Sequence, residues 1–258
     1  MWAIEKEIID KLSIYELMGI IIPGFLGLYA FNLVSSTFFG DIVSISISND
    51  IILGAIYFFA LIFSGVIIHE FGEIIQKYIF IKLWNGFPSE RFLLDDDTMY
   101  SIDVKNILKM AVKERYLLEF PKYTSKESHQ IFNLFYTKLQ SIGRDEKAQI
   151  LNAQYGMVRS FIAGMMILTI IYGIISISIT YSHGFLFAKY DIFLTCLSIL
   201  ILIILGRRLE RFGKRFADYI IRGYYTYYME TKSTEQSNLN TQDRELSPLQ
   251  YTASNKKG

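Results

Sequence analysis

The chain contains a single cysteine, Cys196, among its 258 residues. An intramolecular disulfide is therefore impossible, and so is a metal cluster held by several cysteines. Cys196 lies within an apolar run, and we interpret it as a small side chain buried in a membrane. The sequence also lacks a Gly-x-x-x-x-Gly-Lys phosphate-binding loop and the nucleophile elbow of hydrolases. We expect no cofactor and no enzymatic activity.

An excess of charge of one sign is also missing, because 26 Lys and Arg residues balance 25 Asp and Glu residues to a net charge of +1. Nothing in that balance indicates a nucleic-acid-binding protein. Apolar residues make up 52% of the chain and charged residues 20%, so the two kinds must be segregated along the sequence. The apolar residues form four long runs, and the charged residues lie between and after them.

The four apolar runs approach the length of about 20 residues that a helix needs to cross a bilayer. They cover residues 17–34, 51–68, 161–181 and 192–205. The fourth reaches full length only if it begins near Phe185, which places Lys189 at the membrane surface. Lys6 and Lys11 precede the first run, as in a signal peptide. Acidic residues accompany them and no small-x-small cleavage site follows, so we predict a retained span.

The segments that flank the apolar runs are alternately rich and poor in Lys and Arg. Residues 76–157 hold twelve of them and the segment from residue 206 holds ten, whereas residues 35–50 hold none. Because Lys and Arg accumulate in cytoplasmic loops, we predict a multi-pass membrane protein with both termini in the cytoplasm. The spans themselves carry almost no charge, which disfavours an ion-coupled transporter.

The predicted fold class is an all-α integral membrane protein with four transmembrane helices and a small helical cytoplasmic insertion between the second and third. We assign residues 1–83 to an N-terminal amphipathic segment and the first two spans, 84–157 to the insertion, 158–206 to the last two spans, 207–232 to a basic and aromatic cytoplasmic helix, and 233–258 to a disordered tail.

Apolar periodicity within the insertion predicts one helix around residues 104–112 and a second over residues 125–142. A third helix is expected to begin near Arg144 and to continue into the third span. The run of three aspartates at 95–97 is a cation site, an acidic interaction surface, or a solvated turn that leads into the first of these helices. Calcium loops have ligands at alternating positions, and these aspartates are consecutive, which favours the turn.

The segment 69–73, His-Glu-Phe-Gly-Glu, ends the second run and places His69 and Glu73 on one helix face. Zinc proteases require a second histidine at the position of Glu73. The other two histidines, His129 and His183, are predicted on opposite sides of the membrane. We interpret the segment as a polar turn that pairs with a nearby Lys or Arg. A polar lining for a pore mouth and an intersubunit contact are the alternatives.

The first span carries three further residues of interest. Glu16 is either an interfacial carboxylate near a helix N-terminus or part of an acidic ring that selects cations in an oligomer. Pro23 and Gly24 indicate either a packing kink or a gating hinge. The candidate pore or gating residues are therefore Glu16, Pro23, Gly24, His69, Glu70 and Glu73.

A dense group of basic residues follows the fourth run, and it suits anionic lipid headgroups, with nucleic acid or a phosphorylated ligand as the alternatives. The candidate headgroup-binding or ligand-binding residues are Arg207, Arg208, Arg211, Lys214 and Arg215. Four tyrosines come next, and they either lie at the membrane interface or pack against the insertion. These tyrosines are Tyr224, Tyr225, Tyr227 and Tyr228.

Three parts of the sequence carry a resemblance: residues 15–24 (Tyr-Glu-Leu-Met-Gly-Ile-Ile-Ile-Pro-Gly), residues 65–70 (Gly-Val-Ile-Ile-His-Glu) and Arg159. They resemble a loose group of uncharacterised, small multi-span bacterial membrane proteins, some of which resemble membrane effectors of antiphage systems. In such effectors, oligomers perturb the inner membrane when a cytoplasmic partner or signal arrives. The resemblance covers the first two spans and assigns no site residue.

Two functional hypotheses follow from the division between uncharged spans and a charged cytoplasmic layer. The first is a non-enzymatic, homo-oligomeric protein of the lipid bilayer that responds to a soluble cytoplasmic partner or signalling ligand, as a pore-forming effector of antiphage defence. The second is a membrane anchor or scaffold that recruits a soluble partner through the same layer.

Overall fold

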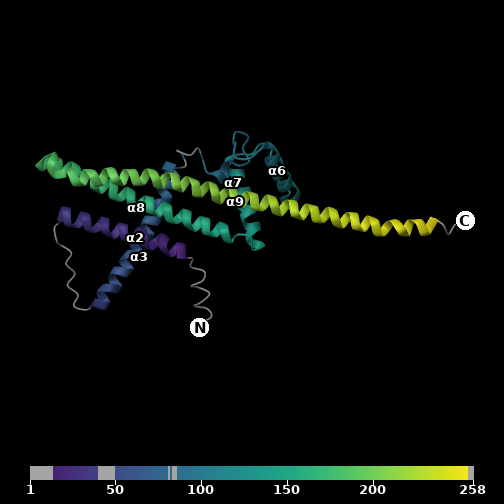
Figure 1. The fold of residues 1–258 in the computed structure, drawn as a ribbon, viewed down its shortest axis with the longest axis horizontal. Coiled ribbons are helices and arrows are strands. Elements are labelled where there is room, and N and C mark those ends of the chain that lie inside the picture. Colours follow the sequence, from purple (N-terminus) through teal and green to yellow (C-terminus); the bar gives the residue numbers. More distant parts are fainter. Residues whose placement is uncertain (1–13, 40–49, 81, 83–85, 255–258) are drawn as a thin grey trace. The chain divides into compact units, whose positions relative to one another are not determined.

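The computed structural model describes residues 14–39, 50–80, 82 and 86–254, and the side chains of residues 19–37, 50–79, 82 and 86–238. Every regular element within these ranges is a helix (Figure 1). The chain divides into two compact units. We call residues 1–87 with 147–216 the membrane bundle, and residues 88–146 with 217–258 the helical head.

The membrane bundle contains α2 (Ile14–Val34), α3 (Asp50–Ile75), α8 (Glu146–His183) and the first part of α9 (Phe185–Ser254). Short π-helical turns, η1 (Ser35–Phe39) and η2 (Gln76–Phe80), follow α2 and α3. Four helices in the described part of the chain include a stretch that is long and apolar enough to cross a membrane. This confirms the four predicted runs, including the short fourth one.

Two glycines bring α2 and α3 into backbone contact. A Cβ added at Gly24 would overlap the carbonyl oxygen of Leu61, and a Cβ added at Gly65 would overlap the carbonyl oxygen of Ile20. Pro23 and Gly24 are both buried, and α2 continues through the proline. The close approach supports the packing interpretation of this Pro-Gly pair, while its role as a gating hinge stays a prediction.

Hydrogen bonds between hydroxyl groups join α8 to two of its neighbours. Tyr29 on α2 lies 2.7 Å from Tyr172, oxygen to oxygen. Thr169 donates to the hydroxyl of Ser198 on α9 at 2.9 Å. Such bonds between membrane helices contribute about 0.6 kcal/mol each on average, so they align the helices more than they hold them together.

The helical head is built from α5 (Pro88–Arg91), α6 (Ile102–Tyr116), α7 (Ser125–Ser141) and the part of α9 that begins at residue 217. The two longer helices confirm the predicted ones. Ser101 caps α6 by accepting a hydrogen bond from the backbone N–H of Val104. Thr124 and Glu127 form a capping box that begins α7.

The second part of α9 supplies one side of the core of the head. Its buried residues recur at helical spacing, and each is at most 1% exposed: Ala217, Ile220, Ile221, Tyr224 and Tyr228. The ring of Tyr224 stacks on Phe135, with 3.7 Å between centroids and 8° between planes. For Tyr224 and Tyr228, packing within the head is therefore confirmed over a place at the membrane interface.

The fourth span and the basic helix predicted from 207 form one continuous helix, and α9 continues into the tail that we assigned from 233. The helix is continuous because a glycine inside a helix costs only about 1 kcal/mol relative to alanine, so Gly206 and Gly213 do not end it. The helix continues past 233 to Ser254, and Glu235 within that stretch accepts a hydrogen bond from Arg115 at 2.6 Å. Side chains after residue 238 lie outside the described residues.

The insertion is also shorter than the predicted 84–157, because residues 147–157 form the first turns of α8 and belong to the membrane bundle. The prediction of one unbroken helix from the region of Arg144 into the third span is confirmed. Glu146, not Arg144, is its first residue.

The aspartates at 95–97 lie in a turn ahead of α6. Lys105, which is only 4% exposed, donates to the carbonyl oxygens of Leu94 at 2.5 Å and Asp97 at 2.6 Å. The buried ammonium thus holds the backbone of the turn, which confirms the turn interpretation. Across the described ranges, no three His, Cys, Asp or Glu side chains are placed to hold one metal ion.

Candidate functional site

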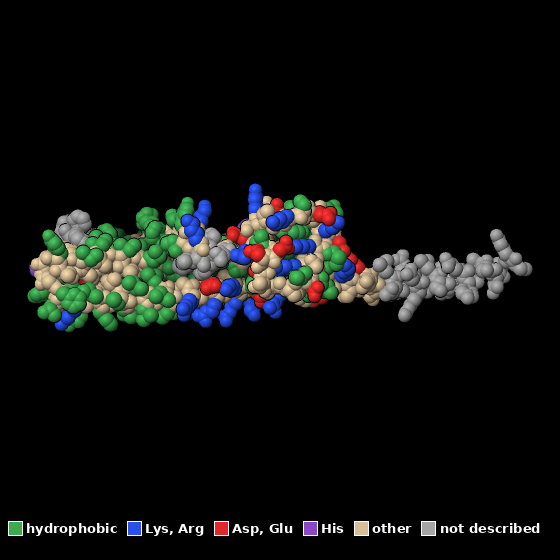
Figure 2. Space-filling model, turned by 90° about the horizontal axis from the view of Figure 1, so that it is seen from above, with side chains coloured by type: hydrophobic (Ala, Val, Ile, Leu, Met, Phe, Trp, Pro, Cys, Tyr) green, Lys and Arg blue, Asp and Glu red, His purple; other side chains and the backbone are tan. Residues whose placement is uncertain are grey.

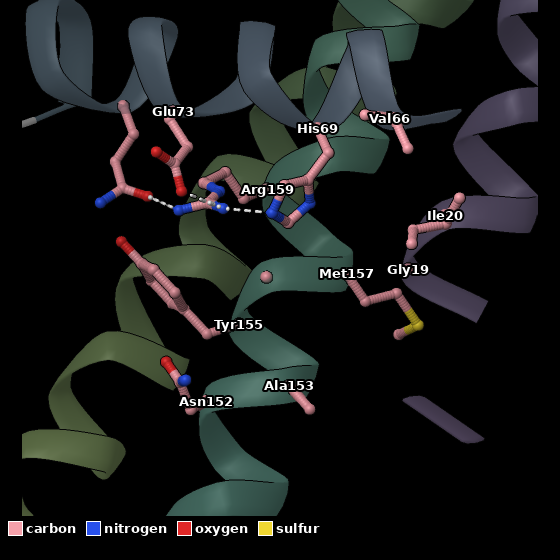
Figure 3. Close-up of a pocket in the computed structure, with 12 residues that line it drawn as sticks. Gly19, Ile20, Val66, His69, Glu73, Asn152, Ala153, Tyr155, Met157 and Arg159 are labelled. Carbon is pink, nitrogen blue, oxygen red and sulfur yellow. Dashed lines mark hydrogen bonds and ion pairs between the residues drawn. The ribbon is translucent and has the colours of Figure 1, made fainter. Parts of the chain in front are cut away.

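A cavity of about 740 Å³ opens between α2, α3 and α8 in the membrane bundle (Figure 3). This volume falls within the usual range for small-molecule sites, about 300–1,000 Å³. Its apolar lining residues are Gly19, Ile20, Val66, Ala153 and Met157, together with Gly156. Its polar lining residues are His69, Glu73, Gln76, Asn152, Tyr155 and Arg159. The wall is therefore amphipathic.

The polar part of the wall comes from the ends of two apolar helices. Along α3 the apolar run ends at Ile68, and His69 and Glu73 follow on the same face. Arg159 stands just before the apolar run of α8 that begins at Phe161. The cavity therefore lies where both helices change from apolar to polar sequence.

Arg159 binds three acceptors that follow one another along α3 and η2. Its Nη2 lies 2.9 Å from Nε2 of His69 and 2.9 Å from Oε1 of Glu73. Its Nη1 donates to the amide oxygen of Gln76 at 3.3 Å. The arginine side chain is 13% exposed, whereas that of Glu73 is 55% exposed. The predicted pairing of this polar turn with a nearby Lys or Arg is confirmed.

The hydrogen bonds around His69 fix its tautomer. Ser160 donates its hydroxyl proton to the carbonyl oxygen of Gly156 at 3.0 Å, so its oxygen accepts from Nδ1–H of His69 at 2.8 Å. Nε2 then carries the lone pair that accepts from Arg159. His69 is a neutral imidazole with both nitrogens engaged, so the arrangement supports a structural role for it and leaves no nitrogen free for a metal.

Two hydrogen-bond donors at this site remain unused. Nε of Arg159 and the hydroxyl of Tyr155 are buried, and neither has a partner among the described residues. A buried donor without an acceptor costs about 1–3 kcal/mol. A hydrogen bond from either donor to an acceptor oxygen would remove this cost.

Gly156 forms an open part of the cavity wall. A Cβ added there would meet only Cε1 of His69, at an ordinary 3.9 Å. At Gly72, by contrast, an added Cβ would lie 3.3 Å from the carbonyl oxygen of Arg159. Gly72 thus serves the close approach of α3 to α8, and Gly156 leaves space.

Other predicted site residues lie outside this cavity. Glu70 is exposed and does not line it. Pro23 and Gly24 belong to the contact between α2 and α3. Glu16 lies in α2, but its side chain is outside the described residues.

The basic residues of α9 form a second, exposed surface in the bundle. Arg207, Arg208, Arg211, Lys214 and Arg215 are all exposed. Lys214 is paired with Glu210 at 2.6 Å, and the guanidinium of Arg208 lies 5.4 Å from the centroid of the Phe212 ring. These side chains form no buried site, and they suit a diffuse attraction to anionic headgroups.

Sequence reasoning did not assign Arg159, Tyr155, Gln76 or Ser160 to a site. The available signal was Arg159 itself, because a charge beside an apolar span is commonly paired within the protein. Its partners lie 83 to 90 residues earlier in the chain, and no local pattern connects positions that far apart.

Searches of family models, curated proteins and solved structures found no match to this chain.

Proposed function

We propose that this chain is a non-enzymatic protein of a bacterial inner membrane that couples an input received by the helical head to the membrane bundle. The proposal rests on one observation: the single helix α9 belongs to both units. Residues 185–216 belong to the bundle, and residues from 217 onward belong to the head. A partner or ligand that repacks the head therefore acts on a helix that also packs in the bundle.

The charge distribution supports a cytoplasmic position for the head. The segments that contribute to it carry most of the Lys and Arg residues of the chain. Figure 2 shows charged side chains gathered over the head and hydrophobic side chains over the bundle. In this proposal the input is a cytoplasmic partner or signalling ligand, and the exposed basic residues of α9 lie at anionic headgroups.

The finer proposal is that several copies assemble and open a path across the membrane, as in the antiphage effectors that the sequence resembles. The apolar surface of α3 supports it. Phe59 and Phe63 are each 69% exposed in the single chain, and Ile51 is 83% exposed. Such a surface meets the requirement for lipid contact and for helix association alike.

Dye entry into infected cells tests this function. Cells that carry the chain with its native neighbouring genes are challenged with a panel of phages, and propidium iodide uptake is measured. We expect at least tenfold more stained cells than in a strain without the chain. Tyr224→Ala removes the stacked core of the head and should abolish the increase, whereas Met229→Ala, at an exposed position of the same helix, should keep it.

Two results would reject parts of the proposal. Absence of dye entry with every phage, together with a monomeric mass in native mass spectrometry, would reject the pore. Dye entry that Tyr224→Ala leaves unchanged, in protein that still reaches the membrane fraction, would reject coupling through the head.

The compact core of the head also favours a second candidate, a membrane anchor. The stacked Phe135 and Tyr224 give the head a core of its own, as an independent recruitment module requires. A defined soluble partner that co-purifies with the full chain, in cells that show no dye entry, would favour this function over the pore.

A further inference from the structure

Two buried donors beside the cavity of the membrane bundle lack an acceptor. The carboxylate of Glu73 and the amide oxygen of Gln76 already accept from the Arg159 guanidinium. Nε of Arg159 and the hydroxyl of Tyr155 find no acceptor within the described chain, although both are buried. A guest that completes the site must bring oxygen atoms that accept hydrogen bonds, as a phosphodiester does.

The opposite wall of the same cavity calls for an apolar guest. Ile20 on α2, Val66 on α3 and Met157 on α8 face it (Figure 3). An inorganic anion would leave this surface uncovered, and a pure hydrocarbon would leave the donors unused. One molecule must therefore present both an oxygen-rich group and an apolar chain.

The level of the cavity along the helices identifies such a molecule. Both α3 and α8 change from apolar to polar sequence beside it, which is the level at which the acyl chains of a bilayer meet its headgroups. The charge also constrains the guest. Arg159 and Glu73 together are neutral, and the carboxylate is half exposed, so a headgroup with both a phosphate and an ammonium is complementary to the pair.

We propose that the cavity between α2, α3 and α8 binds a single zwitterionic phospholipid. Its phosphate oxygens accept from Arg159 and Tyr155, its ammonium faces Glu73, and the upper part of an acyl chain lies against Ile20, Val66 and Met157. This lipid site is independent of the proposed coupling function. Lipid binding is measured without a permeability assay, so a failure to bind lipid would not reject coupling, and a failure of dye entry would not reject the lipid site.

Native mass spectrometry of the full chain, released from detergent micelles, tests the proposal. The protein is titrated separately with dioleoyl phosphatidylethanolamine, dioleoyl phosphatidylglycerol, dioleoylglycerol and inorganic phosphate. We expect one phosphatidylethanolamine per chain, bound at least threefold more tightly than phosphatidylglycerol. Dioleoylglycerol, which lacks the phosphate, and inorganic phosphate, which lacks the chains, should bind at least tenfold more weakly.

Gly156→Leu fills the cavity and should reduce phosphatidylethanolamine binding at least tenfold. Gly173→Leu is the matched control on α8, because a Cβ there would meet no atom within 4 Å, and it should bind as the parent does. Tyr155→Phe keeps the ring and removes one donor, so we expect a several-fold loss for phosphatidylethanolamine and no change for dioleoylglycerol.

Four outcomes would overturn the proposal. They are parental binding by Gly156→Leu, equal binding of dioleoylglycerol and phosphatidylethanolamine, tighter binding of phosphatidylglycerol, and tight binding of inorganic phosphate. The last would identify the guest as a free anion. If Gly156→Leu does not fold, the Tyr155→Phe comparison and the four-ligand series still decide the matter.

Discussion

The guanidinium of Arg159 donates to the neutral imidazole of His69 across 2.9 Å, although 90 residues separate them in the chain. This hydrogen bond fastens α8 to the polar end of α3. The arginine is mostly buried, so its removal leaves the acceptors on α3 without their donor.

Arg159→Leu should therefore destabilise the full chain. It leaves His69, Glu73 and Gln76 without the guanidinium, and we expect a loss of about 1–3 kcal/mol in the free energy of unfolding. Thermal unfolding in detergent, followed by circular dichroism, measures the effect. Arg208→Leu on the exposed surface of α9 is the control and should stay within about 0.5 kcal/mol. Equal shifts in both variants would contradict a structural role for Arg159.

Gly65→Ala should separate α2 from α3. The added Cβ would overlap the backbone carbonyl of Ile20, and backbone cannot move aside as a flexible side chain can. The expected cost is about 1–3 kcal/mol, visible as a lower unfolding temperature in detergent. Gly54→Ala on the same helix meets no atom within 4 Å and should leave that temperature unchanged or raise it, because alanine is the better helix former. If both variants unfold like the parent, the close crossing is wrong.

Phe135→Ala should unfold the helical head. The ring is fully buried and stacks on Tyr224, and truncation of a core phenylalanine costs about 3–5 kcal/mol. Limited proteolysis of the full chain should then cut within residues 88–146 at least tenfold faster than in the parent. Asn133→Ala, at an exposed position of α7, should be cut at the parental rate. A protected head in Phe135→Ala would show that the stacked pair is not central to the core.

The head should lose stability in acid partly through Glu114. A hydrogen bond from Tyr228 and, secondly, one from Lys232 lower the pKa of this carboxyl below its ordinary value of 4.5. A pKa that is lower in the folded state contributes stability above the unfolded pKa, and that contribution is lost as the pH falls through the folded pKa. Between pH 6 and pH 3 the unfolding temperature of the head should fall less in Glu114→Gln than in the parent. An identical fall in both proteins would show that Glu114 is not linked to folding.

The helices could be predicted from the sequence because their signals are local. Apolar runs near 20 residues mark spans, and the capping residues Ser101 and Thr124 mark the starts of α6 and α7. The boundaries failed where a signal was ambiguous. The polar composition after residue 233 suggested a disordered tail, yet α9 continues through it to Ser254. Earlier in the same helix, apolar residues at helical spacing from Ala217 to Tyr228 bury the second part of α9 in the head.

The residues that α3 contributes to the candidate site could be predicted from the sequence, whereas those from α8 could not. The position of His69 and Glu73 on one helix face follows from their spacing of four residues. The contribution of α8 does not, because Arg159, Tyr155 and Gly156 reach the cavity through tertiary packing. The absence of a side chain at Gly156 is especially hard to interpret from sequence, since glycines in apolar helices serve both close contacts and open space.

The head draws its core from two separated parts of the chain, with α8 and the first part of α9 between them. Ribosomes deliver residues in order, so the first part must wait through the synthesis of two apolar helices before Tyr224 and Tyr228 emerge to complete it. Until then Phe135 keeps its edge-to-face contact with Phe92 but lacks the stacked ring of Tyr224. A complete head therefore forms only after the apolar segment of α9 has been synthesised.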